Sequence, residues 1–222
     1  AMHEKIRAIP IDLDAYETIR DREALDRWIA DIMLTGHVAV DTETTGVDNQ
    51  TADLVGISLS TVPGKAAYIP LAHTTGAGEL PEAGGLAEGQ LPIREVLDAL
   101  KPLLEDKSIL KIGHHFKYDL GLLARYGITV TPCDDTILLS YALDGARFNS
   151  LGELAEHWLG HAGVPITELI GTGKGQKNFS QVEIAPAARY AAEDADLTLR
   201  LWHVRKPRLA AERTATVYET LE

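Results

Sequence analysis

The fold is decided by residues 37–71, which read HVAVDTETTGVDNQTADLVGISLSTVPGKAAYIPL. An apolar strand is expected over 37–41, an alternating strand over 54–60 and a third strand over 66–71. Pro63-Gly64 is a turn signal between the second and third strands. The stretch therefore predicts an antiparallel meander of three strands, and the first strand runs directly into the acidic sequence DTE.

Outward from this meander the sequence becomes mainly helical. Asp21 is the expected N-cap of a helix over 21–34, and a fourth strand is expected at 109–112. A short extended piece is expected at 128–130, and residues 171–177 are expected to form a loop. Residues 74–90 are expected to form an exposed, mobile loop with solvated Glu side chains. Further helices are predicted over 93–104, 116–126, 136–143, 151–159, 186–205 and after Pro207. This order predicts one α/β domain with a mixed central sheet, made of the meander plus parallel strands, and a helical C-terminal half.

Composition places the chain among ordinary globular proteins. It has 222 residues, 45% of them hydrophobic, which is enough for a sizeable core. A single cysteine, Cys133, excludes an internal disulfide framework and fits a reducing compartment. No apolar run approaches ~18 residues and no signal peptide is visible, so a cytoplasmic protein without a membrane partner is expected. With 21 Lys+Arg against 33 Asp+Glu, the net charge of −12 argues mildly against a domain that holds nucleic acid through phosphate contacts alone.

Acidic side chains recur on three of the predicted elements. Asp41 and Glu43 are two residues apart at the end of a strand, so they project from the same face. Asp119 lies in the first turns of the helix after the fourth strand, and Tyr190 and Asp194, four apart, share one face of the long helix. Taken singly, these are most simply solvated acids or favourable charges near a helix N-terminus. Glu193 and Asp196 fall off the shared face and are expected to be solvated.

Four carboxylates converging on one sheet edge would require cations. Two carboxylates ~4 Å apart repel by about 4 kcal/mol at an effective dielectric constant of about 20. Oxygen ligands favour Mg²⁺ or Mn²⁺, and two such ions ~3.5–4 Å apart promote in-line displacement at a phosphodiester. The residues therefore favour two-metal phosphodiester hydrolysis.

Three segments carry a family resemblance: DTETTG at 41–46, HFKYD at 115–119 and YAAEDAD at 190–196. They resemble the three motifs of the DEDDy 3′–5′ exonucleases, and the wording is closest to the proofreading domain of bacterial DNA polymerase I. Similarity extends from about residue 16 to the end of the chain. The resemblance implies an RNase H-like exonuclease fold. It also implies a lead-in over 1–15, an exonuclease domain over 16–206 and, over 207–222, the start of a helical connection toward a polymerase domain, in keeping with a final helical pattern that has no capping residue.

The resemblance also implies roles for the acidic residues. Asp41, Glu43 and Asp194 would ligate the tighter of two Mg²⁺ or Mn²⁺ ions, and Asp41 would bridge to the second ion. Asp119 would hold that second ion, through waters. Tyr190 would orient the attacking water rather than act as the base, because an unperturbed tyrosine has a pKa near 10.

Substrate contacts follow from the same resemblance. Thr42, Val47, His115, Lys174 and Lys177 are expected to bind the substrate. Val47 occupies a position where the family has a larger apolar wedge against the terminal base, and His115 a position where the polymerase I pattern usually has Asn. The two lysines are expected near phosphates. The implied substrate is a single-stranded or frayed DNA 3′ end, and the implied partner is the polymerase domain of the same parent chain, in a monomeric, nucleoid-associated bacterial enzyme.

Two rival functions remain open at this point: an RNA 3′ exonuclease of the RNase D type and a catalytically silent polymerase scaffold. The remaining motifs are assigned less specific roles. Gly171–Gly175 reads GTGKG but lacks the spacing of a phosphate-binding loop. His157 and His161 are four apart and are expected to form a surface pair, since no third zinc ligand is evident. Asp134-Asp135 is expected to cap the helix that follows, with Asp135 near the site but not a ligand.

Overall fold

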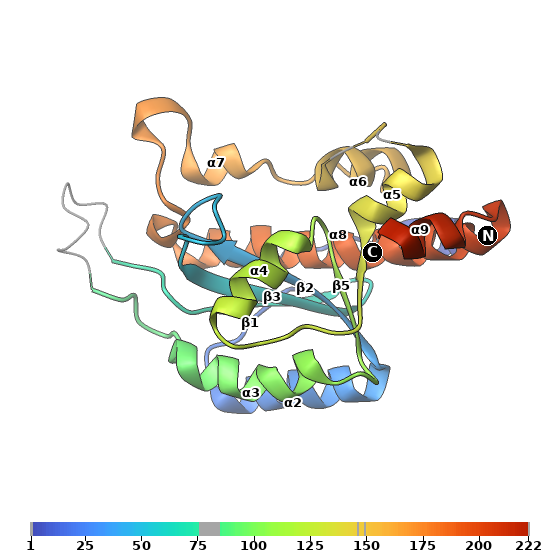
Figure 1. The fold of residues 1–222 in the computed structure, drawn as a ribbon. Helices are drawn as coiled ribbons and strands as arrows, with labels where there is room; N and C mark the ends of the chain where they lie inside the picture. Colours follow the sequence, from blue (N-terminus) through green and yellow to red (C-terminus); the bar gives the residue numbers. More distant parts are fainter. Residues whose placement is uncertain (1, 76–84, 146, 149, 222) are drawn as a thin grey trace.

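A mixed sheet forms the centre of the protein in the computed structural model, which describes residues 2–75, 85–145, 147–148 and 150–221 (Figure 1). The strand order is β1-β4-β3-β2-β5-β6. The strands span Glu17–Thr18 (β1), His37–Thr44 (β2), Leu54–Val62 (β3), Lys65–Pro70 (β4), Leu110–Gly113 (β5) and Cys133–Asp135 (β6). Strands β2, β3 and β4 form the predicted antiparallel meander, and β5 and β6 extend it in parallel from β2. The mixed sheet is thus confirmed, with an additional edge strand, β1, parallel to β4.

Helices make up most of the remaining described structure. Five predicted helices, over 21–34, 93–104, 116–126, 136–143 and 151–159, are found with ends shifted by at most one residue. Among the described residues, no helix is both long enough and apolar enough to cross a membrane. The helices are α1 (Met2–Ala8), α2 (Arg22–Thr35), α3 (Ile93–Glu105), α4 (Lys117–Arg125), α5 (Thr136–Asp144), α6 (Leu151–Leu159), α7 (Ile166–Ile170), α8 (Ile184–Glu212) and α9 (Ala215–Leu221), with 3₁₀ turns at Gly173–Gly175 and Phe179–Gln181.

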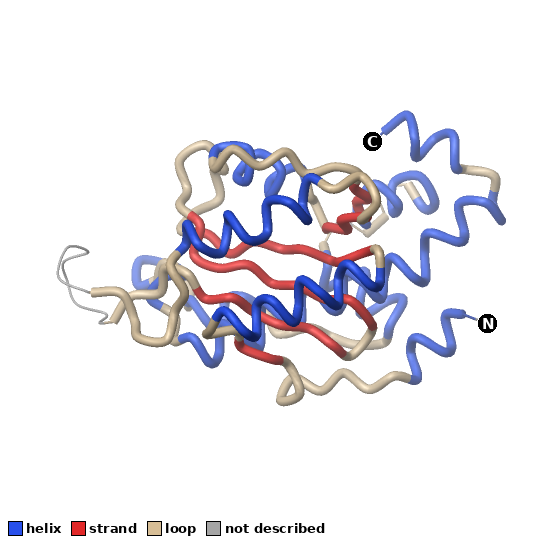
Figure 2. Tube along the Cα trace, turned by 90° about the horizontal axis from the view of Figure 1, so that it is seen from below, coloured by secondary structure: helices blue, strands red, loops and turns tan. Residues whose placement is uncertain are grey.

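The two faces of the sheet carry different layers. Helices α2 and α3 run side by side across one face, and the long helix α8 crosses the other (Figures 1 and 2). Along β2, Val38 and Val40 pack into the core beneath α2 and α3, whereas Ala39 packs with Leu199 of α8. Because side chains alternate along a strand, Asp41 and Glu43 share the face of Ala39 and point toward α8. The sheet therefore separates this apolar core from Asp41 and Glu43.

Helix α8 is longer and more deeply buried than the sequence pattern predicted. The helix expected over 186–205 begins at Ile184 and continues through Pro207 to Glu212, so the boundary expected between residues 206 and 207 lies inside it. Helix α8 packs against the sheet and also against α1, α5 and α6. Glu193 and Asp196 are consequently 1% and 0% exposed, and the prediction that they are solvated is wrong.

Buried polar partners compensate these two acids. Asp196 accepts hydrogen bonds from Arg200 Nε at 2.9 Å, from the Tyr16 hydroxyl at 2.7 Å and from the Gly64 amide at 2.9 Å. Glu193 Oε1 lies 2.6 Å from His161 Nε2, and its Oε2 accepts from the Val164 amide at 3.0 Å. A buried acid is tolerated when it is paired and hydrogen-bonded in this way.

The connecting segments differ from expectation in three places. The parallel strand β6 starts at Cys133, after the extended piece expected at 128–130. His161 lies beyond the end of α6 at Leu159, so it and His157 are not neighbours on one helix; His157 stacks on Phe148 instead. The expected loop over 74–90 lies partly outside the described residues. Among its described residues, Thr74 and Leu86 form an isolated β-bridge, and Glu88 is exposed as predicted.

Candidate active site

The acidic end of β2 owes its geometry to its neighbours on the sheet. Glu43 pairs with Gly56 of β3, and the register shifts directly after Glu43. A Cβ at Gly56 would lie 2.0 Å from the Tyr68 hydroxyl, so the glycine makes room for that side chain beside Glu43. Tyr68 is fully buried, and its hydroxyl lies 2.8 Å from Nε2 of His73. His73 Nδ1 lies 2.8 Å from the Val182 carbonyl, which only an N–H can approach, so Nε2 accepts from the Tyr68 hydroxyl.

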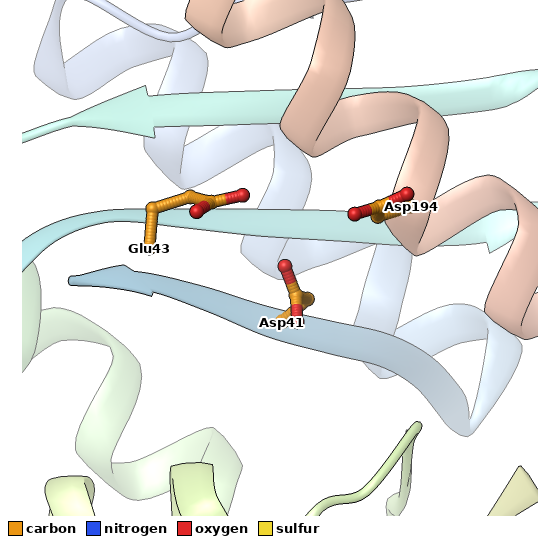
Figure 3. A group of neighbouring side chains, drawn as sticks. All are labelled: Asp41, Glu43 and Asp194. Carbon is orange, nitrogen blue, oxygen red and sulfur yellow. The ribbon is translucent and has the colours of Figure 1, made fainter. Parts of the chain in front are cut away.

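Asp41, Glu43 and Asp194 form a compact carboxylate cluster between β2 and α8. Each offers an oxygen within 4.8 Å of the others, and Figure 3 shows the three groups turned toward one another. In the described part of the chain, no Lys, Arg or His forms a salt bridge with any of them. The cluster therefore concentrates negative charge that the protein itself does not neutralise.

The pKa values express the cost of this arrangement. Burial raises the pKa of Asp41 from 3.8 to about 7. Burial, together with the charge of neighbouring carboxylates, also raises the pKa values of Glu43 and Asp194 well above their ordinary range. A set of oxygen donors with this much repulsion fits hard divalent cations such as Mg²⁺ or Mn²⁺.

Asp119 lies beside this cluster and is held by β2. Its Oδ1 accepts hydrogen bonds from the Thr42 amide, at 3.0 Å, and from the Thr42 hydroxyl. Asp119 is 4% exposed, and burial and the charge of Asp41 raise its pKa well above the ordinary value. Thr42 therefore points toward α4, on the opposite side of β2 from Asp41 and Glu43, and connects the fourth carboxylate to the strand that carries the first two.

Tyr190 lies one helical turn before Asp194 on α8. Burial raises its pKa well above the ordinary value, and the charges of Asp194 and Glu43 add to the effect. The phenol is therefore protonated at neutral pH, and a hydrogen bond from it partly opposes the rise in the pKa of Asp194. Tyr190 is a hydrogen-bond donor at this site.

A cleft of about 890 Å³ opens over Asp41, Glu43, Asp119 and Tyr190, whereas Asp194 is not among its lining residues. Its walls come from residues 41–47, from α4, from Ile166 and Ile170 of α7 and from residues 176–179. Val47 is 98% exposed on the wall, and Lys177 also lines the cleft. Lys174 is exposed but is not among the lining residues, so of the two lysines expected near the substrate the structure places one at the cleft.

Tyr118, another wall residue, was missed by the sequence reasoning. Its hydroxyl donates to the Gly46 carbonyl at 2.6 Å and lies 2.7 Å from Thr44 Oγ1, which joins α4 to the loop after β2. The signal was available, because Tyr118 stands inside the HFKYD segment. Tyr68 of β4 and His73, which follows that strand, lie in the segment AAYIPLAH at 66–73, which also resembles the family, but no role was predicted for either residue.

His115 reaches the cleft from an unusual backbone position. It has φ +54°, the left-handed region that residues with a Cβ rarely adopt. Two residues earlier, a Cβ at Gly113 would lie 2.2 Å from the Phe116 ring, so the chain turns tightly between β5 and α4. The His115 amide donates to Asp135 Oδ1 at 3.0 Å, and Asp135 also caps α5 through the Ile137 amide at 2.9 Å. The expectation that Asp135 caps this helix near the site is confirmed.

Comparison with known proteins identifies the family to which this chain belongs. The family model described as 3′-5′ exonuclease matches residues 16–209. DNA polymerase I of Rhizobium leguminosarum is 49% identical over 232 residues; the match covers 100% of this chain and 23% of that relative, so the chain spans less than a quarter of its length.

Solved structures show the fold. NrnC of Brucella melitensis superposes with a TM-score of 0.62 at 23% identity, covering 93% of this chain and 85% of that one. Escherichia coli RNase D, described as an exoribonuclease involved in structured RNA processing, gives a TM-score of 0.56 at 20% identity. The match covers 90% of this chain and 50% of the RNase D chain. These neighbours are RNase H-like exonucleases, so the predicted fold class is confirmed.

Proposed function

Since the chain belongs to the 3′–5′ exonuclease family, we propose that it removes 5′-mononucleotides stepwise from DNA 3′ ends, as the proofreading part of a DNA polymerase I. The observation that carries the proposal is the cluster of Asp41, Glu43 and Asp194, whose ligand oxygens lie within 4.8 Å of one another and of which Asp41 and Glu43 line the cleft. DNA is preferred to RNA as the substrate because the relative at 49% identity is a DNA polymerase, whereas the likeness to RNase D is one of fold. The substrate is a single-stranded or frayed 3′ end, and the polymerase domain of the parent chain is the partner.

The carboxylates would hold two divalent cations, Mg²⁺ or Mn²⁺. Asp41, Glu43 and Asp194 would hold one, and Asp119 together with Asp41 would hold the other. Such ions, when bound, supply activation of the attacking water and stabilisation of the charge that develops on the phosphate and the leaving 3′ oxygen. The uncompensated charge of the cluster supports this assignment, because cations would relieve the repulsion that raises these pKa values.

The other residues bind and orient. The Tyr190 phenol, which stays protonated and donates to Asp194, would accept a hydrogen bond from the attacking water and so orient it. Val47, almost fully exposed on the cleft wall, contacts the terminal base. His115 donates a hydrogen bond to the substrate end, and Lys177 lies close enough to the cleft to contact a phosphate. Lys174 would contact the strand outside the cleft, from the same loop.

A labelled-substrate assay tests the proposal. Single-stranded DNA and RNA of the same sequence, labelled at the 5′ end to follow shortening or at the 3′-terminal nucleotide to follow release, are incubated with Mg²⁺ or Mn²⁺, with EDTA as the chelated control. The wild type is compared with Asp119→Ala and with Asp98→Asn, a control that removes an exposed charge of α3. We expect the wild type and Asp98→Asn to shorten DNA one nucleotide at a time and to release 5′-mononucleotides. Both activities should be lost with EDTA and in Asp119→Ala. Trimming of RNA but not DNA would assign the chain to the RNase D type, and no release from either would leave a silent scaffold.

A further inference from the structure

We propose that Asp135 and Tyr218 are positioning residues of this site: together they set where the N-terminus of α4 lies, and with it His115 and Asp119. The inference rests on the proposed exonuclease function and deepens it. Neither residue lines the wall of the cleft, and Tyr218 lies on α9, 99 residues beyond Asp119 in the sequence (218 − 119). Their effect is exerted through hydrogen bonds to the backbone.

Asp135 supplies the acceptors that the start of α4 lacks. The capping position of α4 is occupied by Phe116, whose side chain forms no capping hydrogen bond. The Asp135 carboxylate accepts from the His115 amide at 3.0 Å and from the Phe116 amide at 2.8 Å. The first amides of a helix have no partner within it, so a carboxylate from another element stabilises them in place of a local cap. Because the same carboxylate also accepts from Ile137, it fixes α4 relative to α5.

The left-handed conformation of His115 depends on the same contact. A residue with a Cβ is retained at a positive φ where surrounding contacts determine the backbone. Here the amides of His115 and of the next residue both donate to Asp135, which is 7% exposed. Asp119 follows within the first turn of α4, so a movement of this turn would carry both its carboxylate and the His115 side chain away from the cluster.

Tyr218 holds Asp135 in turn. Its ring is 1% exposed, and its hydroxyl accepts from the Asp135 amide at 3.0 Å while it donates to Asp134 Oδ1 at 2.9 Å. The Asp134 carboxylate also accepts from Trp202 Nε1 and Lys206 Nζ of α8, each at 2.6 Å. The end of β6 is thereby fixed by two helices, and Asp135 cannot shift without breaking buried hydrogen bonds.

Geometry of this kind matters for catalysis. Of the four carboxylates, Asp119 alone comes from α4; it belongs neither to β2 nor to α8. A misplacement of about 1 Å in a catalytic constellation can lower the rate by about 100-fold. Loss of the Tyr218 hydroxyl should therefore lower kcat more than it raises KM, because it moves a group that acts on the reacting phosphate.

The test compares Tyr218→Phe, which keeps the buried ring, and Asp135→Asn, which keeps the size of the side chain, with Tyr16→Phe. Tyr16 is a matched control, because its hydroxyl also donates to a buried aspartate, Asp196, at 2.7 Å, but that contact does not lead to α4. Measurements are kcat and KM on single-stranded DNA, the Mn²⁺ concentration for half-maximal rate, and the amide NMR resonances of His115 and Phe116 in the metal-free protein.

We expect kcat to fall by about fivefold in Tyr218→Phe and by about 30-fold in Asp135→Asn, with KM within about twofold of the wild type. The two amide resonances should shift upfield in both variants and stay in place in Tyr16→Phe. Equal losses of kcat in Tyr218→Phe and Tyr16→Phe, or unmoved His115 and Phe116 resonances in Tyr218→Phe, would overturn the inference. If the wild type hydrolyses nothing, the proposed function fails, and the amide resonances still decide whether Tyr218 and Asp135 position α4.

Discussion

Replacing Asp41 by asparagine removes one negative charge from the cluster of Asp41, Glu43 and Asp194 while nearly preserving the shape of the side chain. In the metal-free protein the pKa of Asp41 rises from 3.8 to about 7 because the group is removed from water. The difference of about 3 pH units corresponds to about 4 kcal/mol, at about 1.4 kcal/mol per unit. Asp41 is only partly buried, so water screens part of this cost, and we expect Asp41→Asn to stabilise the metal-free protein by about 2 kcal/mol at pH 8.

The pH dependence follows from the direction of the shift. A group whose pKa is higher in the folded state binds its proton more tightly there, so its contribution to stability is present at low pH and is lost as the pH rises. For Asp41 this loss extends from about pH 4 to beyond pH 7. The variant lacks the titrating group, so its advantage over the wild type should be small at pH 5 and largest at pH 8.

Thermal unfolding in EDTA, followed by circular dichroism at pH 5, 6, 7 and 8, measures this difference. A gain of about 2 kcal/mol corresponds to about 4–8 °C in Tm for a domain of this size. In Mg²⁺ the order should reverse at pH 8, because ions that bind the folded wild type stabilise it. Asp98→Asn, on the exposed side of α3, should leave Tm within about 1–2 °C of the wild type. An Asp41→Asn protein that melts at or below the wild type at pH 8 in EDTA, or a gap that does not change with pH, would refute the reasoning.

Three further changes have effects that follow from single contacts. Gly113→Ala places a Cβ 2.2 Å from the Phe116 ring and should lower the free energy of unfolding, measured in urea, by about 1–3 kcal/mol. The control Gly152→Ala, on α6 with open space around it, should raise that free energy by about 0.5–1 kcal/mol. An unchanged stability in Gly113→Ala would contradict the tight turn. Arg200→Met leaves buried Asp196 without its cation and should cost about 3–5 kcal/mol, again measured in urea, and a loss below 1 kcal/mol would show that the pair is dispensable. Thr42→Val removes the hydroxyl that donates to Asp119 and should raise the Mg²⁺ concentration for half-maximal hydrolysis about threefold. An unchanged midpoint would argue against a link between Thr42 and the ion proposed at Asp119.

Local signals predicted most of the fold. Asp21 does cap α2, through the Ala24 amide, and the meander is formed as the alternation of β3 and the Pro63-Gly64 turn indicated. Strand β1 was missed because two residues carry no periodicity, and its pairing with β4 depends on a tertiary contact. The continuation of α8 through Pro207 was also missed, because proline ordinarily ends a helix and the packing of the long helix overrides that preference here.

For the candidate site, spacing predicted which acids meet but not how they are held. Asp41 and Glu43 share a face for reasons contained in β2 itself, and Asp194 joins them from α8. The burial of Glu193 and Asp196 was not predictable from helical periodicity, because α8 is enclosed on several sides and has no solvated face at these positions. The contact of Asp135 with His115 links β6 to the start of α4, and one sequence contains no signal for a contact of that kind.

The alternation of β2 has a consequence for how this domain can vary in length. Inserting one residue between Ala39 and Asp41 would turn both carboxylates to the face of β2 that carries Val38 and Val40, and would bring Thr42 to the face where cations are expected. The same insertion among residues 48–52, within the loop between β2 and β3, would leave each side chain of β2 on its present face of the sheet. Natural variants and engineered libraries should therefore contain insertions and deletions in that loop and none between residues 38 and 43, whatever the size or polarity of an inserted residue.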